Sequence, residues 1–125
     1  MDIAQQLLGA IPVIRVTGDL DRLSAPVLEK AFQAHIKAAN HRIILDLSDC
    51  SYVDSGGLAV IMTTVGELRD DGLLAIVAGD RSMRRLLEVV GLYEHRRCAV
   101  FKAEREALSA LGEVRHPSPS DGSPS

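Results

Sequence analysis

The sequence predicts one α/β domain with a mixed, largely parallel sheet of four to five strands, covered by about four helices. Two observations carry this prediction. Hydrophobic periodicity alternates between strand-like runs and helix-like stripes along residues 1–112. The apolar residues are mostly aliphatic, because aromatics make up only 3% of the chain and Trp is absent. Such a composition suits an α/β core better than a β-sandwich.

The first strand and helix are expected within residues 11–39. Residues 11–17 are apolar and β-branched, as in a strand, and the segment Gly18-Asp19-Leu20-Asp21 predicts a turn after it. Ser24 is the expected N-cap of the following helix, with Pro26 in its first turn. Apolar residues at helical spacing continue this helix to Ala39.

The second unit repeats this order. Residues 42–47 (RIILDL) form a continuous apolar run, which is typical of a buried parallel strand. Residues 48–51 are expected to form a turn or loop. A helix is then predicted over residues 55–70, and Asp71-Gly72 ends it. Residues 73–78 (LLAIVA) predict another buried strand.

The remaining segments complete the alternation. A third helix is expected over residues 82–90, because Gly91 suits the position after a helix end. Residues 98–101 predict a short strand, and residues 103–111 a last amphipathic helix. Residues 2–8 either add an antiparallel edge strand or form a helical turn.

Several classes of function are disfavoured by composition. The net charge of −3 comes without a basic stripe, so direct nucleic-acid binding is not expected. No apolar run approaches the roughly 20 residues that span a bilayer, and the N-terminus lacks the pattern of a signal peptide. A cytoplasmic protein with two free thiols, Cys50 and Cys98, is therefore expected. Residues 113–125 predict a disordered Pro/Ser-rich tail.

One segment carries a family resemblance. Residues 42–58, RIILDLSDCSYVDSGGL, resemble the STAS domain pattern in which a strand ending in D-L-S leads through a loop to D-S-[small]-G-L at a helix start. The GDLD turn at residues 18–21, the MRRLL and GL pair in residues 83–92, and the last helix resemble further family segments. Gly56 departs from the pattern, because many members carry Ser, Ala or Thr there.

The resemblance implies an anti-sigma factor antagonist, which is a bacterial regulator and not an enzyme. In that family the unphosphorylated antagonist binds an anti-sigma factor that is a serine kinase, and so frees the sigma factor. Phosphorylation blocks this binding, and a serine phosphatase reverses it. Carried over, the phosphoacceptor is Ser55. The resemblance implies no cofactor, and we expect a monomer.

The residues around Ser55 admit two interpretations. Ser55 or Asp54 could simply cap the helix. Alternatively, an exposed Ser55 could accept phosphate, because a helix N-terminus tolerates negative charge and Gly56-Gly57 would leave room for a kinase. The expected partner-binding residues are Asp19, Asp21, Asp54, Gly56, Gly57 and Leu58. The acids could also be turn residues and caps, and Leu58 could equally be a core residue.

Other functions have weaker support. The segment DSGG is not a G-x-S-x-G nucleophile elbow, and no His has an evident reason to meet Ser55. Neither a P-loop nor a G-x-G-x-x-G motif is present. Asp46 and Asp49 flank a strand end without a His to complete a metal site. The main alternative is a STAS scaffold subunit of a stress-signalling or lipid-transport assembly, without a phosphorylation switch.

Overall fold

The computed structural model describes residues 1–115, and the side chains of residues 1–112. The elements are, in order, β1 (Asp2–Leu8), β2 (Ile11–Leu20), α1 (Ala25–Lys37), β3 (Arg42–Val53), α2 (Ser55–Glu67), β4 (Leu73–Val77), α3 (Arg81–Val89), a 3₁₀ turn η1 (Leu92–Glu94), β5 (Cys98–Phe101) and α4 (Glu104–Arg115). α4 thus runs past its predicted end at Leu111, and the predicted tail from residue 116 on lies outside the described residues.

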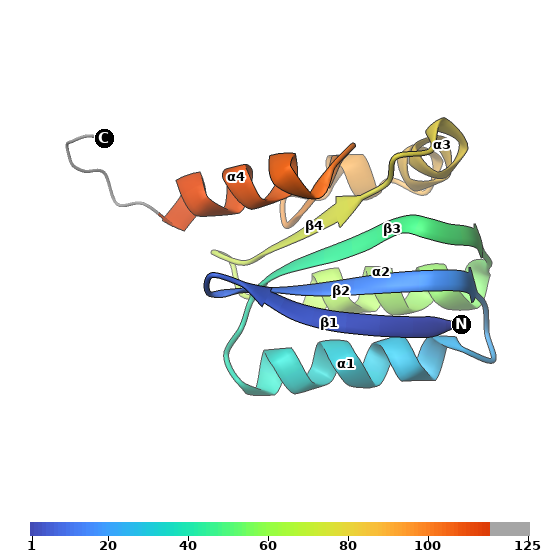
Figure 1. The fold of residues 1–125 in the computed structure, drawn as a ribbon, viewed down its shortest axis with the longest axis horizontal. Coiled ribbons are helices and arrows are strands. Elements are labelled where there is room, and N and C mark those ends of the chain that lie inside the picture. The colour runs from blue at the N-terminus through green and yellow to red at the C-terminus, as the bar shows by residue number, and fades with distance from the viewer. Residues whose placement is uncertain (116–125) are drawn as a thin grey trace.

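One mixed sheet forms the centre of the molecule (Figure 1). Its strand order is β1-β2-β3-β4-β5, with β1 antiparallel to β2 and every other neighbouring pair parallel. This confirms the predicted sheet, and it makes residues 2–8 an edge strand rather than a helical turn. The alternation of strand and helix explains the topology, because parallel neighbours need a crossover helix between them.

Two apolar clusters hold helices against the two faces of the sheet. The larger cluster joins one face to α1, α2 and α3, and includes Leu28, Phe32, Ile61, Val65, Met83 and Leu87. The smaller joins the other face to α4, through residues such as Val13, Ile44, Val77, Ala107 and Leu111. Within residues 1–115, three helices therefore cover one face and α4 alone covers the other.

Strands β2 and β3 are longer than predicted, and this shapes one end of the molecule. The expected turn at residues 18–21 and loop at residues 48–51 are wrong, because residues 18–20 continue β2 and pair with β3, which runs through residues 48–51. The pairing continues to Leu20 opposite Val53, whereas β3 pairs with β4 only as far as Asp46 opposite Val77. A two-stranded ribbon, residues 17–20 with 49–53, thus projects beyond β4.

A bidentate ion pair anchors α4 at its first turn. The Arg15 guanidinium donates hydrogen bonds from Nε and Nη2 to the two carboxylate oxygens of Glu104, at 2.6 and 2.8 Å. These bonds lower the pKa of Glu104 from an ordinary 4.5 to about 2. Asp46 lies nearby, and burial raises the pKa of its carboxyl group. The ion pair between Arg15 and Glu104 therefore fixes the start of α4. The partly buried carboxyl group of Asp46 lies beside this ion pair.

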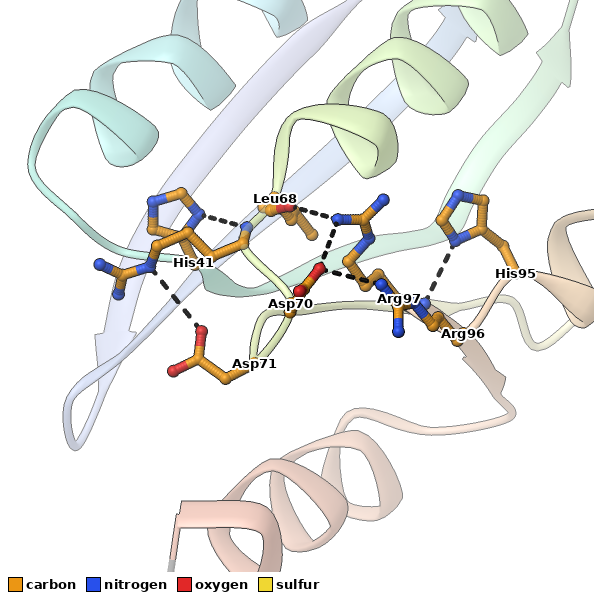
Figure 2. A network of polar contacts seen from close by, with 8 residues as sticks. His41, Leu68, Asp70, Asp71, His95, Arg96 and Arg97 are labelled. Carbon is orange, nitrogen blue, oxygen red and sulfur yellow. Dashed lines mark hydrogen bonds and ion pairs between the residues drawn. The ribbon is translucent and has the colours of Figure 1, made fainter.

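Polar contacts fasten the far end of α2, at the amino ends of the parallel strands (Figure 2). Arg97 Nη1 donates to the Leu68 carbonyl at 2.7 Å and lies 3.5 Å from the Asp70 carboxylate. The Arg69 backbone N–H donates to Nδ1 of His41 at 3.1 Å. The Arg97 side chain is only 19% exposed, so solvent screens its contacts less than those of the exposed Arg69 and Arg96 side chains.

Two negative findings concern the part of the chain that the structure describes. Within residues 1–115, no helix has the length and apolarity that crossing a bilayer requires. The described His, Cys, Asp and Glu side chains also form no group suited to holding a metal ion.

Candidate functional site

Ser55 is the first residue of α2, and Asp54 alone separates it from the end of the projecting ribbon at Val53. Its side chain is exposed. It lines a shallow pocket of about 260 Å³ together with Asp21, Arg22, Leu23 and Asp54. The connections after β2 and β3 thus meet at one end of the sheet, and a partner can reach the Ser55 hydroxyl.

Asp54, and not Ser55, caps α2. The Oδ1 atom of Asp54 accepts a hydrogen bond from the Gly57 backbone N–H at 3.0 Å, and Oδ2 accepts one from the Arg22 N–H at 3.1 Å. The Asp54 backbone is extended, as an N-cap requires. The choice between Asp54 and Ser55 that the sequence left open is thereby made, and the Ser55 hydroxyl is not needed for capping.

Asp21 organises the loop between β2 and α1. Its Oδ1 atom accepts hydrogen bonds from the Leu23 N–H at 3.0 Å, from the Ser24 N–H at 2.9 Å and from the Ser24 hydroxyl at 3.0 Å. The bonds from Ser24 are the main reason that the pKa of Asp21 lies below its usual value. Ser24 is the N-cap residue of α1, as predicted, but its side chain makes no capping hydrogen bond. Its hydroxyl holds the loop instead.

Gly56 and Gly57 allow α2 to approach the β2–α1 connection closely. A Cβ atom on Gly57 would lie 2.7 Å from Leu20 Cγ and 2.8 Å from the Leu20 carbonyl oxygen. A Cβ atom on Gly56 would lie 2.8 Å from Arg22 Cα. Both separations are too short for real atoms, so any side chain would push the loop away. Gly57 is buried in this contact, which is a packing role that the sequence did not reveal.

Leu58 and Asp19 occupy different environments. Leu58 is half-buried and packs against the larger core cluster, so much of its side chain is a core contact. Asp19 is exposed on β2, opposite Tyr52 of β3 in the register of the ribbon. All the expected partner-binding residues therefore gather around Ser55, at the carboxyl ends of β2 and β3.

Two exposed apolar residues beside Ser55 were missed from the sequence. Leu23, which lines the same pocket as Ser55, is 88% exposed, and Tyr52 on the ribbon is 56% exposed. An isolated apolar residue in a loop or on a ribbon has no periodic pattern to mark it. Their exposure is seen only in the folded chain, and they share it with other apolar residues such as Val27 and Val89.

The histidines and cysteines lie away from this site or are buried. His35 Nε2 is 2.8 Å from the Gln5 side-chain oxygen, and His41 and His95 lie at the opposite end of the sheet (Figure 2). Cys50 and Cys98 are free thiols, as predicted. Both are buried, and burial raises the pKa of Cys98 to about 12. Within the described residues, no histidine base stands beside Ser55.

Comparison with known sequences gives the family. The family model described as "Mlab, STAS domain" matches residues 3–101. An anti-sigma-B factor antagonist of Staphylococcus epidermidis is 30% identical over 80 residues, which are 63% of this chain and 74% of that protein. The antagonist of Staphylococcus aureus strain NCTC 8325 is 31% identical with the same coverage. This chain therefore belongs to the STAS domain, anti-sigma factor antagonist family.

Solved structures show the same fold. An anti-sigma factor antagonist from Mycobacterium paratuberculosis superimposes with a TM-score of 0.81 at 24% identity, over 89% of this chain and 93% of that one. The Bacillus cell fate determinant SpoIIAA in its phosphorylated form gives a TM-score of 0.69 at 20% identity, over 88% and 99% of the two chains. At these identities the agreement concerns the fold.

Proposed function

We propose that this chain is an anti-sigma factor antagonist in which Ser55 is the phosphoacceptor. Unphosphorylated, it binds an anti-sigma factor that is a serine kinase, and so frees the sigma factor. Phosphorylation of Ser55 ends the binding, and a serine phosphatase restores it. The observation that supports this most is the exposed Ser55 at the start of α2, with the capping role already taken by Asp54.

The names of the relatives support this proposal. Two of them are named anti-sigma-B factor antagonists, and SpoIIAA, which shares the fold, has been solved in a phosphorylated form. The segment Asp54-Ser55-Gly56-Gly57-Leu58 stands in this chain at the strand-to-helix junction where the family places its acceptor. We therefore assign the same role to Ser55.

A phosphate on Ser55 changes the surface more than the fold. It adds a charge of about −1.5 to −2 at the N-terminus of α2, where the helix dipole favours anions. The added charge stands next to the Asp54 carboxylate, and Arg22 is the one cation lining the pocket. The phosphate thus makes the surface more negative and bulkier without breaking a hydrogen bond that holds it.

We expect the partner to contact exposed side chains around Ser55 that make no hydrogen bond within the fold. Both carboxylate oxygens of Asp54 and the Oδ1 atom of Asp21 accept hydrogen bonds from the loop and from α2, so we assign these two residues to shaping the surface. Asp19, Leu23 and Tyr52 are exposed around Ser55. We assign the direct contacts to these three, since an apolar contact flanked by a charge is easily disrupted by a buried phosphate.

Phosphorylation by the cognate kinase tests the acceptor. The purified protein is incubated with candidate anti-sigma kinases and ATP, and the phosphate is located by mass spectrometry. We expect one phosphate on Ser55 that Ser55→Ala abolishes. Ser51→Ala is the matched control, because Ser51 is also exposed and lies on the adjacent ribbon, and it should still be modified. Equal modification of Ser55→Ala and the wild type would refute the assignment.

A second candidate is a STAS scaffold subunit that carries no phosphorylation switch. The observation in its favour is that the matching family model is described by Mlab rather than by an antagonist. The two candidates differ in an observable way. A scaffold subunit would assemble into large particles, visible by light scattering, and would not be modified by any cognate kinase.

A further inference from the structure

A basic pocket lies away from Ser55, between α3, η1 and the connection from β5 to α4. Its volume is about 420 Å³. It is lined by Arg81, Arg84, Arg85, Glu88, Tyr93 and Lys102. Four cations thus face one hollow in a chain whose net charge is −3. The proposed antagonist function makes no use of this pocket.

Arg84 is fixed in this pocket by the backbone. Its Nη1 atom donates hydrogen bonds to the carbonyl oxygens of Ala78 and Gly79, both at 2.9 Å. These two carbonyls follow the end of β4, so they hold the guanidinium against the sheet. The remaining donors of the guanidinium, on Nε and Nη2, have no recorded partner among the described residues. A planar guanidinium held in this way can bind an oxyanion without losing further side-chain entropy.

The charges of the pocket are not neutralised by neighbouring acids. The ion pairs recorded among the described residues involve Arg15, Arg69, Arg96 and Arg97, and none of the four cations of the pocket. Glu88 is the single acid in the lining, and it leaves a net charge of three positive units. Mutual repulsion of exposed cations is a cost that a bound anion would remove.

The position of the arginines on α3 adds a second unfavourable electrostatic interaction to the repulsion among the cations. α3 begins at Arg81 and is capped by Asp80, whose carboxylate accepts a hydrogen bond from the Ser82 N–H, while the first turn itself contains no acidic residue. Arg81 and Arg84 stand in the first turn of α3, where the helix dipole disfavours cations, and Arg85 follows directly after it. Cations at the N-terminal end of a helix are unfavourable for stability, and such exceptions are expected at functional sites.

We propose that this pocket binds a small anion that carries phosphate groups. Arg84 supplies fixed donors, Arg81 and Arg85 supply flexible ones from α3, and Lys102 closes the pocket from the end of β5. Tyr93, which is 45% exposed, offers a hydroxyl and an aromatic face. A single concave site of this volume suits a phosphorylated small molecule, whereas an acidic peptide needs cations spread along a surface.

Titration of the ¹⁵N-labelled protein with inorganic pyrophosphate, at about 0.15 M salt, tests the proposal. We expect saturable shifts of the backbone amides of Arg81, Arg84, Arg85 and Lys102. The double variant Arg81→Ala/Arg85→Ala should bind at least about tenfold more weakly. Lys30→Ala/Lys37→Ala, which removes two exposed cations from α1, is matched in charge and should bind like the wild type.

Three results would overturn the proposal. The first is a pyrophosphate titration that does not saturate. The second is an equal loss of affinity in the two double variants. Either result would mean that pyrophosphate is attracted by the general charge of the protein and not by this pocket. The third is binding of a polyglutamate peptide, but not of pyrophosphate, to the same residues. Because the arginines changed are exposed, thermal unfolding should show that both double variants stay folded. Phosphorylation of Ser55 is a separate measurement, so either proposal can fail alone.

Discussion

The Asp54 carboxylate accepts a hydrogen bond from the backbone N–H of Arg22, 32 residues earlier in the chain, at 3.1 Å. Its other oxygen caps α2 through Gly57. One side chain therefore links the loop after β2 to the start of the helix that carries Ser55. The position of Ser55 relative to Leu23 and the rest of its pocket depends on this link.

Removal of this link should loosen the site and destabilise the fold. Asp54→Ala loses both hydrogen bonds, and we expect a loss of about 1–2 kcal/mol in the free energy of unfolding. Urea denaturation measures the loss, and hydrogen exchange should show faster exchange of the Arg22 and Gly57 amides. Asp54→Asn keeps one acceptor oxygen and should lose less. Equal stability of Asp54→Ala and the wild type would contradict this account of the cap.

The close contact at Gly57 predicts opposite effects for two glycines of α2. Gly57→Ala places a methyl group against Leu20 and should cost about 1–3 kcal/mol of stability. Gly66 lies on the same helix, and a Cβ atom there would meet nothing within 4 Å. Gly66→Ala should therefore stabilise the protein by about 0.5–1 kcal/mol through helix propensity. Thermal unfolding of both variants measures the difference, and effects of the same sign would refute it.

The ion pair between Arg15 and Glu104 predicts a pH dependence of stability. Because the pKa of Glu104 is about 2 in the folded protein and 4.5 ordinarily, its contribution is complete above the unfolded value. It is lost as the pH falls from that value toward 2. Arg15→Met should cost about 1–3 kcal/mol at neutral pH, and less as the solution is acidified. A difference from the wild type that stays constant with pH would contradict this.

Asp46 supplies a control of opposite sign. Its pKa is raised by burial, so ionisation costs stability as the pH rises through the folded value. Asp46→Asn should therefore be more stable than the wild type at neutral pH, with the advantage fading in acid. Urea denaturation at several pH values measures both variants. The Asp46 carboxylate accepts a hydrogen bond from the Ser48 N–H at 2.9 Å. A loss of stability in Asp46→Asn at neutral pH would show that this bond outweighs the cost of burying the charge.

The start of α2 is expected to tolerate a negative charge at Ser55. Ser55→Asp should change the free energy of unfolding by no more than about 1 kcal/mol, because the helix dipole offsets repulsion from Asp54. Differential scanning calorimetry measures the change, and Ser55→Ala serves as the control. A large drop in melting temperature for both variants would mean that Ser55 is chiefly structural.

The order of the elements could be predicted from the sequence, whereas the ends of β2 and β3 could not. Apolar periodicity marks the parts of a strand that face a core. Ser48, Asp49 and Ser51 are polar and exposed, so the backbone pairing of the ribbon has no trace in their side chains. The same limit applies to Ala39, which was expected to be helical. It lies beyond the end of α1 with a φ of 66°.

The residues around Ser55 could be found because they are adjacent in the sequence, but their roles could not. Gly56 and Gly57 suggested access for a kinase, and the structure shows that they allow close packing against Leu20 and Arg22. The basic pocket was missed because Lys102 joins the arginines of α3 only in the folded chain. The distribution of charge along the sequence does not reveal a cluster of cations that forms only on folding.

The affinity of the anti-sigma factor for the protein with and without phosphate on Ser55 tests the central claim most directly. Calorimetric titration of the unphosphorylated protein, the Ser55-phosphorylated protein and Ser55→Ala against the same anti-sigma factor gives the three dissociation constants. We predict that phosphorylation weakens binding at least about a hundredfold, and that Ser55→Ala binds within about threefold of the unphosphorylated protein. Equal affinity of the phosphorylated and unphosphorylated proteins would contradict the account.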